Sequence, residues 1–283
     1  MAQMPRPPAA GRLHSVFQRA CTFQFESDYL LALVAPEVGN GPLNVVLERM
    51  PVGWQHLQPG TAVRFEDKRV QVDGVNVYLD GASIWEPCPD WERLRADATP
   101  ILRRAELLTD WVQERAPGGS MPALLNEPSR DDGPTGSVVH ARALAGAESM
   151  WAGWQGNESQ VRAGTAQLAG LGGGLTPAGD DFLLGAMLCA WLAHPDPVWY
   201  CRLVVEEAAS RTTMLSAAFL RATASGECGA VWHRLLETLG GDSEERLTAT
   251  AAAVLSYGHT SGADALAGFL WMGQRVLGGS SRA

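Results

Sequence analysis

The chain has 283 residues, of which 46% are hydrophobic and 19% charged, so it can bury a sizeable core without disulfide or metal staples. Its formal net charge is −9, with no cluster of Lys and Arg, which argues against nucleic acid and anionic membrane surfaces as partners. The longest apolar run, 182–193, is too short to span a bilayer and the N-terminus lacks a secretory pattern, so we expect a cytoplasmic protein.

The N-terminal part of the chain alternates between apolar and polar residues with a period near two, which is typical of β-strands. We expect strands at 29–34, 43–47, 61–65, 69–72 and 75–79. Glu66-Asp67-Lys68 and Asp73-Gly74 are tight-turn signals, because Asp-Gly supplies the positive φ that a two-residue hairpin turn requires. The pattern predicts a small β-rich domain over residues 12–88.

Beyond Pro89 the spacing of Ala, Leu, Arg and Glu becomes helical. The first predicted helix covers 90–115, with a break before Pro100, and a polar loop follows at 127–137. Further helices are predicted at 138–153, 158–168, 177–193, 197–210, 212–224, 228–239, 243–257 and 262–277. The fold class is therefore α+β, with the small β-rich domain packed on a mostly helical C-terminal domain over residues 89–279.

A glycine-rich turn at 170–179 opens into the apolar segment that begins at Phe182. Glycines free backbone N–H groups to face a ligand at a helix N-terminus, where the helix dipole favours negative charge. The turn is not a Walker loop, because no Lys follows it, and it is not a dinucleotide fingerprint, because no parallel strand precedes it. We therefore expect it to bind an anion.

Asp180 and Asp181 follow this turn, and two carboxylates there would repel a bare anion. Either a cation such as Mg²⁺ bridges the acids to the ligand, or the acids accept hydrogen bonds from N–H₂ groups of a neutral part of the substrate. A purely structural alternative is that they stabilise the helix dipole by ~0.3–1 kcal/mol. The apolar helix gives no surface reason for two adjacent acids at its tip, which favours a role in a site.

A second constellation, at 258–264, contains His259, Ser261 and Asp264. Ser261 and Asp264 match a capping box, which pairs free N–H groups at a helix start, and a cap explains Asp264 as well as a ligand contact does. His259 precedes the cap, where little side-chain bulk competes for space, and we favour a functional role for it.

A third constellation, Arg211-Thr212-Thr213, lies at the junction of two predicted helices and is followed by Ser216. An Arg beside two hydroxyl groups can hold a carboxylate or phosphate through two parallel hydrogen bonds. With equal weight, Thr212 could be a helix N-cap and Arg211 a solvated charge at the end of the preceding helix.

The three motifs in this order, G-L-G-x-G-L-T-P-x-G-D-D, R-T-T and G-H-T-S-G-x-D, resemble the AllH-like family, whose named member is a subunit of oxamate carbamoyltransferase. The resemblance spans most of the chain. It implies a part in carbamoyl transfer between carbamoyl phosphate and oxamate, the step of allantoin catabolism that breaks down oxalurate, together with other carbamoyltransferase subunits. This chain has Ala178 where Ser is as common, which removes a hydroxyl from the turn.

The positions that match the family motifs are the substrate-binding candidates Gly172, Gly173, Gly174, Thr176, Gly179, Arg211, Thr212, Thr213, Thr260, Ser261 and Asp264, and the catalytic candidates Asp180, Asp181 and His259. On this resemblance the glycine backbone and the Thr176 hydroxyl would receive a phosphate or an oxyanion, and Arg211 the carboxylate of the acceptor. His259 would move a proton at the attacking amide nitrogen. The paired acids would orient the carbamoyl N–H₂ or bind Mg²⁺.

Two other functions stay open at the level of the sequence. The Asp pair at one helix start, with His259 and Asp264 at another, could hold one or two divalent ions, as in a metal-dependent hydrolase. The chain could also be a non-catalytic assembly subunit, since its β-rich domain and ten tryptophans allow for partner contacts.

Overall fold

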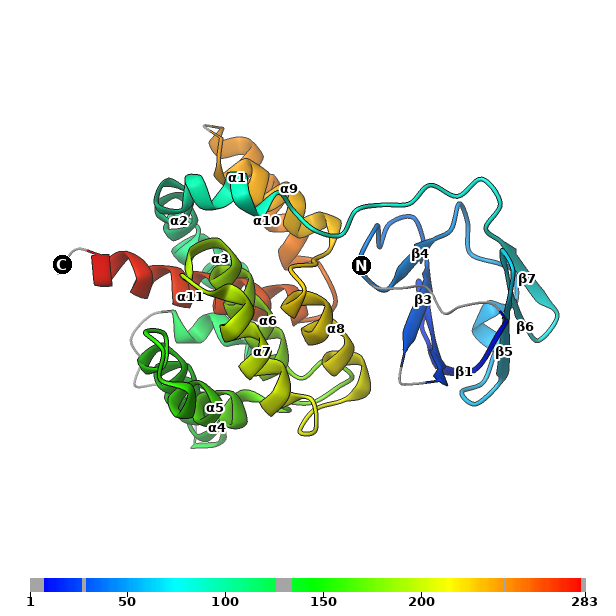
Figure 1. Cartoon of the computed structure of the whole chain (residues 1–283), viewed down its shortest axis with the longest axis horizontal. Helices are drawn as coiled ribbons and strands as arrows, with labels where there is room; N and C mark the ends of the chain where they lie inside the picture. Colours follow the sequence, from blue (N-terminus) through cyan, green and yellow to red (C-terminus); the bar gives the residue numbers. More distant parts are fainter. Residues whose placement is uncertain (1–7, 27–28, 126–133, 242, 281–283) are drawn as a thin grey trace. The chain divides into compact units, whose positions relative to one another are not determined.

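The computed structural model describes residues 8–26, 29–125, 134–241 and 243–280. The chain divides into two compact units, Met1–Pro87 with Cys228–Ala230, and Cys88–Glu227 with Val231–Ala283. The first contains β-strands and the second helices, which confirms the predicted α+β class (Figure 1). Within the described ranges, none of the helices combines the length and apolarity that a bilayer crossing needs.

The first unit is a seven-stranded curled sheet with the order β4-β3-β2-β1-β5-β6-β7. Its strands are β1 (Ala9–Val16), β2 (Ala20–Phe25), β3 (Leu30–Val34), β4 (Asn44–Val46), β5 (Ala62–Glu66), β6 (Arg69–Val72) and β7 (Val75–Tyr78). Neighbouring strands are antiparallel, except that β3 and β4 are parallel. The five predicted strands are present, whereas β1 and β2 were not predicted individually, because their sequences mix polar residues and Gly into the apolar pattern.

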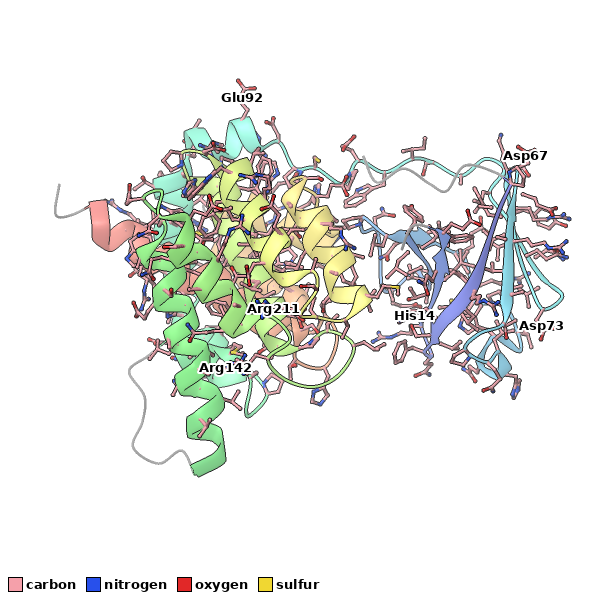
Figure 2. All side chains as sticks on the ribbon, turned by 60° about the horizontal axis from the view of Figure 1, so that its bottom comes forward. His14, Asp67, Asp73, Glu92, Arg142 and Arg211 are labelled. Carbon is pink, nitrogen blue, oxygen red and sulfur yellow. The ribbon has the colours of Figure 1, made fainter. Side chains whose placement is uncertain are left out.

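Two tight turns close the last hairpins of this sheet, as predicted. Asp67 lies between β5 and β6 with φ +50°, and Asp73 and Gly74 join β6 to β7 with φ +42° and +78° (Figure 2). In the Asp73-Gly74 turn both central residues have positive φ, which matches the right-handed twist of the flanking strands. The core of the unit consists of apolar side chains from the strands, among them Leu13, Phe23, Leu33, Val63, Phe65 and Val70.

The helices of the second unit are α1 (Trp91–Ala96), α2 (Ala98–Glu106), α3 (Thr109–Arg115), α4 (Pro134–Ala152), α5 (Glu158–Leu168), α6 (Ala178–Ala193), α7 (Pro197–Ala208), α8 (Met214–Ala224), α9 (Ala230–Leu239), α10 (Glu244–Leu255) and α11 (Ser261–Ser280), with a 3-10 turn η3 (Met121–Leu124). The predicted first helix is in fact three helices. One break is at Asp97, so Pro100 lies in the first turn of α2, where proline is tolerated, and the second break, at 107–108, was not predicted. Residues 127–133 of the predicted polar loop lie outside the described residues, and its last residues, 134–137, are helical, because α4 already begins at Pro134.

Helix α6 is apolar on all sides and is packed against α11, which passes close to it in the interior of the helical unit (Figure 1). Glycines make the close approach possible. A Cβ added to Gly185 would collide with the carbonyl oxygen of Ala265, and one added to Gly268 with that of Phe182. This crossing holds the first turns of α6 and α11 side by side, and the predicted site residues lie there.

Candidate functional site

The glycine turn and the turn before α11 meet through their hydroxyl groups. The Thr176 and Ser261 hydroxyl oxygens are 2.9 Å apart and share a hydrogen bond. The carboxyl group of Asp181, in the first turn of α6, lies close to both hydroxyls, which favour its charged form. The first and second constellations therefore form one cluster, although Thr176 and Ser261 are 85 positions apart in the chain.

Asp180 joins the third constellation to the glycine turn. One of its oxygens accepts the Gly170 N–H at 2.9 Å, the other accepts the Thr212 hydroxyl, and Ser216 adds a further hydrogen bond. Asp180 is buried, which raises its pKa, and these donors oppose that shift by favouring the charged form. Both oxygens accept hydrogen bonds from the chain itself, so Asp180 ties the start of the glycine turn to Thr212. We call this set of contacts the Asp180 brace.

Thr213 completes this brace. Its hydroxyl donates to the Leu175 carbonyl oxygen in the glycine turn and accepts the Ser216 N–H at 3.1 Å, which makes it the N-cap of α8. The alternative in which Thr212 is the N-cap is therefore wrong. Thr212 starts no helix because its hydroxyl is engaged by Asp180.

A buried pair of carboxyl groups, Asp181 and Asp264, forms the interior of the cluster. Their exposed fractions are 8% and 0%. One oxygen of Asp264 accepts the Met121 N–H at 2.7 Å, and the Thr260 hydroxyl also bonds this carboxyl group. Within the described residues, the second oxygen of each acid, Oδ2, has no hydrogen-bond partner.

Burial controls the protonation of the pair. It raises the pKa of Asp181 to about 8, and the nearby charges of Asp264 and Asp180 act in the same direction. Burial likewise raises the pKa of Asp264 to about 6. At neutral pH Asp181 is therefore largely protonated, while Asp264 is largely ionised.

The predicted capping box of Ser261 and Asp264 does not form. Ser261 is the first residue of α11, and the Asp264 N–H bonds the Thr260 carbonyl oxygen at 2.9 Å. The Ser261 hydroxyl is directed to Thr176 and Asp181, and the Asp264 carboxyl group to Met121. The pattern matches a cap in spacing, but tertiary partners take both side chains.

The exposed part of the glycine turn presents free backbone donors. Within the described residues, the N–H groups of Gly172, Gly173 and Gly174 make no hydrogen bond. Gly172 and Gly174 have φ +114° and +90°, and the space beside Gly173 and Gly174 is open. By contrast, a Cβ at Gly179 would collide with the Leu168 carbonyl oxygen, so the structure gives Gly179 a packing role.

Arg211 and His259 are less closely tied to the cluster. The Arg211 side chain is half-exposed and pairs with Glu207 at 2.7 Å, at the end of α7 (Figure 2). Its backbone, however, contacts the glycine turn, because a Cβ at Gly170 would collide with the Arg211 carbonyl oxygen. His259 is exposed in the turn before α11. Ligand binding by Arg211 and proton transfer by His259 stay predictions.

Two contributors were not predicted from the sequence. Burial of its hydroxyl and the charge of Asp181 raise the pKa of Tyr257, so this hydroxyl lies within electrostatic range of Asp181, and its position immediately before Gly258 could have suggested it. Met121 contributes only a backbone N–H from η3. No side-chain pattern could have revealed that contact.

The structure leaves Asp180 no free oxygen for a Mg²⁺ ion. Among the residues that the structure describes, no group of three or more His, Cys, Asp or Glu side chains is arranged to hold a metal. Both oxygens of Asp180 already accept hydrogen bonds from the chain. The geometry therefore gives no support to Asp180 as a metal ligand, and metal binding by Asp181 stays a prediction.

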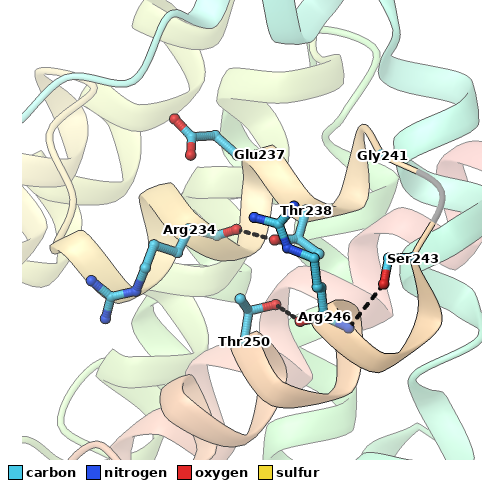
Figure 3. A pocket seen from close by; sticks show the side chains of 7 residues that line it. All are labelled: Arg234, Glu237, Thr238, Gly241, Ser243, Arg246 and Thr250. Atoms are coloured by element: carbon cyan, nitrogen blue, oxygen red, sulfur yellow. Dashed lines mark hydrogen bonds between the residues drawn. The ribbon is translucent and has the colours of Figure 1, made fainter.

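A surface pocket of about 200 Å³ lies elsewhere, between α9 and α10 (Figure 3). Its lining residues are Arg234, Glu237, Thr238, Gly241, Ser243, Arg246 and Thr250, none of which is a predicted site residue. The Thr238 hydroxyl donates to the Arg234 carbonyl oxygen at 2.7 Å, and that of Thr250 to Arg246 at 3.0 Å. Both hydroxyls donate to backbone carbonyl oxygens of their own helices, so they do not indicate a ligand site.

Fold and site together define an α+β protein whose helical unit combines an open glycine turn with a buried acid pair. A family model described as AllH family N-terminal domain matches residues 2–84, and one described as oxamate carbamoyltransferase subunit AllH matches residues 168–273. Together they cover about two thirds of the chain, and the second contains all three constellations. The chain belongs to the AllH family. No solved structure matches it.

Proposed function

We propose that this chain is a subunit of a carbamoyltransferase and that its glycine turn binds the anionic group of a small substrate, in transfer between carbamoyl phosphate and oxamate. The observation that carries the proposal is the meeting of the three constellations. The Asp180 brace and the Thr176–Ser261 bond fix both ends of the glycine turn, whose open N–H groups belong to Gly172–Gly174, to the elements that carry the acids.

The chemistry of carbamoyl transfer asks for such an arrangement. The reaction passes through a tetrahedral centre, and both its oxyanion and the departing phosphate are stabilised by preorganised donors. Backbone N–H groups held by a braced turn supply such donors without reorganisation during the reaction. In this proposal Ser261 donates to Thr176, which leaves the single hydroxyl hydrogen of Thr176 as a further donor to the ligand at the edge of the turn.

The partners follow from the family. Its name denotes a subunit, which supports assembly with other carbamoyltransferase subunits. Arg211 is paired with Glu207, so in this proposal the glycine turn holds the anionic group of the substrate, phosphate or carboxylate, and any contribution of Arg211 is tested separately. His259, exposed in the turn before α11, would exchange a proton with the attacking nitrogen of the acceptor.

Calorimetry on the full chain tests the proposal, with carbamoyl phosphate, oxamate, oxalurate and inorganic phosphate as ligands. We expect binding of at least one, and a loss of about tenfold in affinity in Thr176→Val, because a hydrogen bond to a charged group is removed. Thr250→Val is the matched control, since its hydroxyl bonds only within α10. Arg211→Ala shows whether the guanidinium also contributes.

The proposal fails if the full chain binds none of these ligands, both alone and in the presence of the other subunits. That result would favour the non-catalytic assembly role. Equal losses in Thr176→Val and Thr250→Val would also contradict the placement of the ligand at the turn.

A further inference from the structure

The acid pair holds two buried oxygens that the chain leaves unused, and each acid can still accept a hydrogen bond, because Asp264 is largely ionised and a protonated Asp181 keeps its carbonyl oxygen. Oδ2 of Asp181 and Oδ2 of Asp264 lack a hydrogen-bond partner among the described residues. Leaving a buried polar atom unpaired costs about 1–3 kcal/mol, and most such atoms in proteins have a partner. Two unpaired acceptors on neighbouring acids therefore indicate that donors come from outside the chain.

The surroundings restrict the kind of donor. No Lys, Arg or His side chain of the described residues bonds either acid or influences its pKa. The neighbouring groups are the hydroxyls of Thr176, Ser261 and Tyr257. A small group with two N–H donors on one nitrogen, such as a primary amide, matches two acceptors within one cluster.

We propose that Asp181 and Asp264 bind the N–H₂ of a carbamoyl or amide group and thereby select such ligands over analogues that lack it. This inference rests on the proposed function, because it places the ligand's anionic end at the glycine turn. Thr176 links the two subsites, since it ends the turn, bonds Ser261 and lies close to Asp181. Asp180 takes no part in the selection, because both its oxygens are used by Gly170 and Thr212.

Isosteric ligand pairs test the selection by titration calorimetry on the full chain. Carbamoyl phosphate and acetyl phosphate differ only in N–H₂ against CH₃, and so do oxamate and pyruvate. We expect the N–H₂ member of at least one pair to bind tenfold or more tightly. The pair that shows the preference identifies whether the acids hold the carbamoyl donor or the acceptor.

Asp264→Asn and Asp181→Leu, which has a similar volume and no hydrogen-bond acceptor, then locate the selection. In Asp264→Asn the side-chain carbonyl oxygen can still accept the Met121 N–H, while the free acceptor becomes a donor. We expect the preference for N–H₂ to fall below about twofold in both variants, with the affinity for inorganic phosphate changed by less than about twofold. Asp90→Asn, an exposed N-cap whose side chain accepts the Arg93 N–H and pairs with the Arg93 guanidinium, is the matched control and keeps the preference.

The outcomes separate this inference from the proposed function. Equal affinities within both pairs in the wild type, with the anions still bound, overturn the selection and leave the anion site standing. A preference that survives in both Asp variants also overturns it. If none of the compounds binds, inorganic phosphate included, both proposals fall.

Discussion

Asp180 and Asp181 are adjacent and chemically identical, yet their surroundings differ. Asp180 receives donors from Gly170, Thr212 and Ser216, whereas Asp181 keeps one oxygen without a partner among the described residues. Their carboxyl groups therefore divide the work, one holding the site together and the other facing the ligand. The sequence shows only that two acids follow the turn.

Asp180→Ala tests the bracing role. The substitution leaves the Gly170 N–H and the Thr212 hydroxyl without their acceptor, so we expect the free energy of unfolding to fall by about 3 kcal/mol. Urea unfolding measures it. Asp90→Ala, at an exposed N-cap, should cost only about 1 kcal/mol. Equal losses in the two variants would show that Asp180 braces nothing.

The raised pKa of Asp181 predicts a pH dependence of stability. Its folded-state pKa is about 8 and the ordinary value is 3.8. Between these values the folded protein keeps a proton that the unfolded chain has released, so the contribution of Asp181 to the free energy of unfolding declines as pH rises. The side chain of Asp181→Asn cannot titrate. We therefore expect its free energy of unfolding to rise relative to that of the wild type by about 1 kcal/mol per pH unit between pH 6 and 8.

Urea unfolding of both proteins across this pH range measures the difference. Asp264, whose pKa is about 6, also contributes a decline in the free energy of unfolding, but this contribution is common to both proteins and cancels to first order. Parallel stability curves for wild type and variant would contradict the raised pKa of Asp181.

At the scale of elements, the crossing of α6 and α11 positions the site. Gly268→Ala places a methyl group against the Phe182 carbonyl oxygen, and we expect it to lower the free energy of unfolding by about 2 kcal/mol. Gly278→Ala in the same helix meets only open space and should raise it by about 0.5–1 kcal/mol. Opposite signs in thermal or urea unfolding are the expected result, and a destabilised Gly278→Ala would undermine the argument.

Local signals predicted most elements of this fold. Asp73-Gly74 specified a hairpin because positive φ is a property of those residues themselves, and α5 began and ended as predicted. The capping box at Ser261 failed because tertiary partners outcompeted a local pattern. The contact of Met121 with Asp264 joins residues 143 positions apart, and nothing local encodes it.

At the scale of the whole molecule, the net charge of −9 bears on how an anion is bound. A site built from neutral N–H groups gains little from long-range attraction, so raising potassium chloride from about 20 to 200 mM should change the dissociation constant of inorganic phosphate by less than about twofold. Calorimetry measures this. A loss of tenfold would indicate that a cationic side chain, such as Arg211, holds the ligand.

A crystal structure of the full chain with oxamate tests the central claim most directly. The account predicts the carboxylate on the N–H groups of Gly172–Gly174 and the amide nitrogen within hydrogen-bond distance of Asp181 and Asp264. Oxamate bound at Arg211 or in the pocket between α9 and α10, with the turn and the acids untouched, would contradict it.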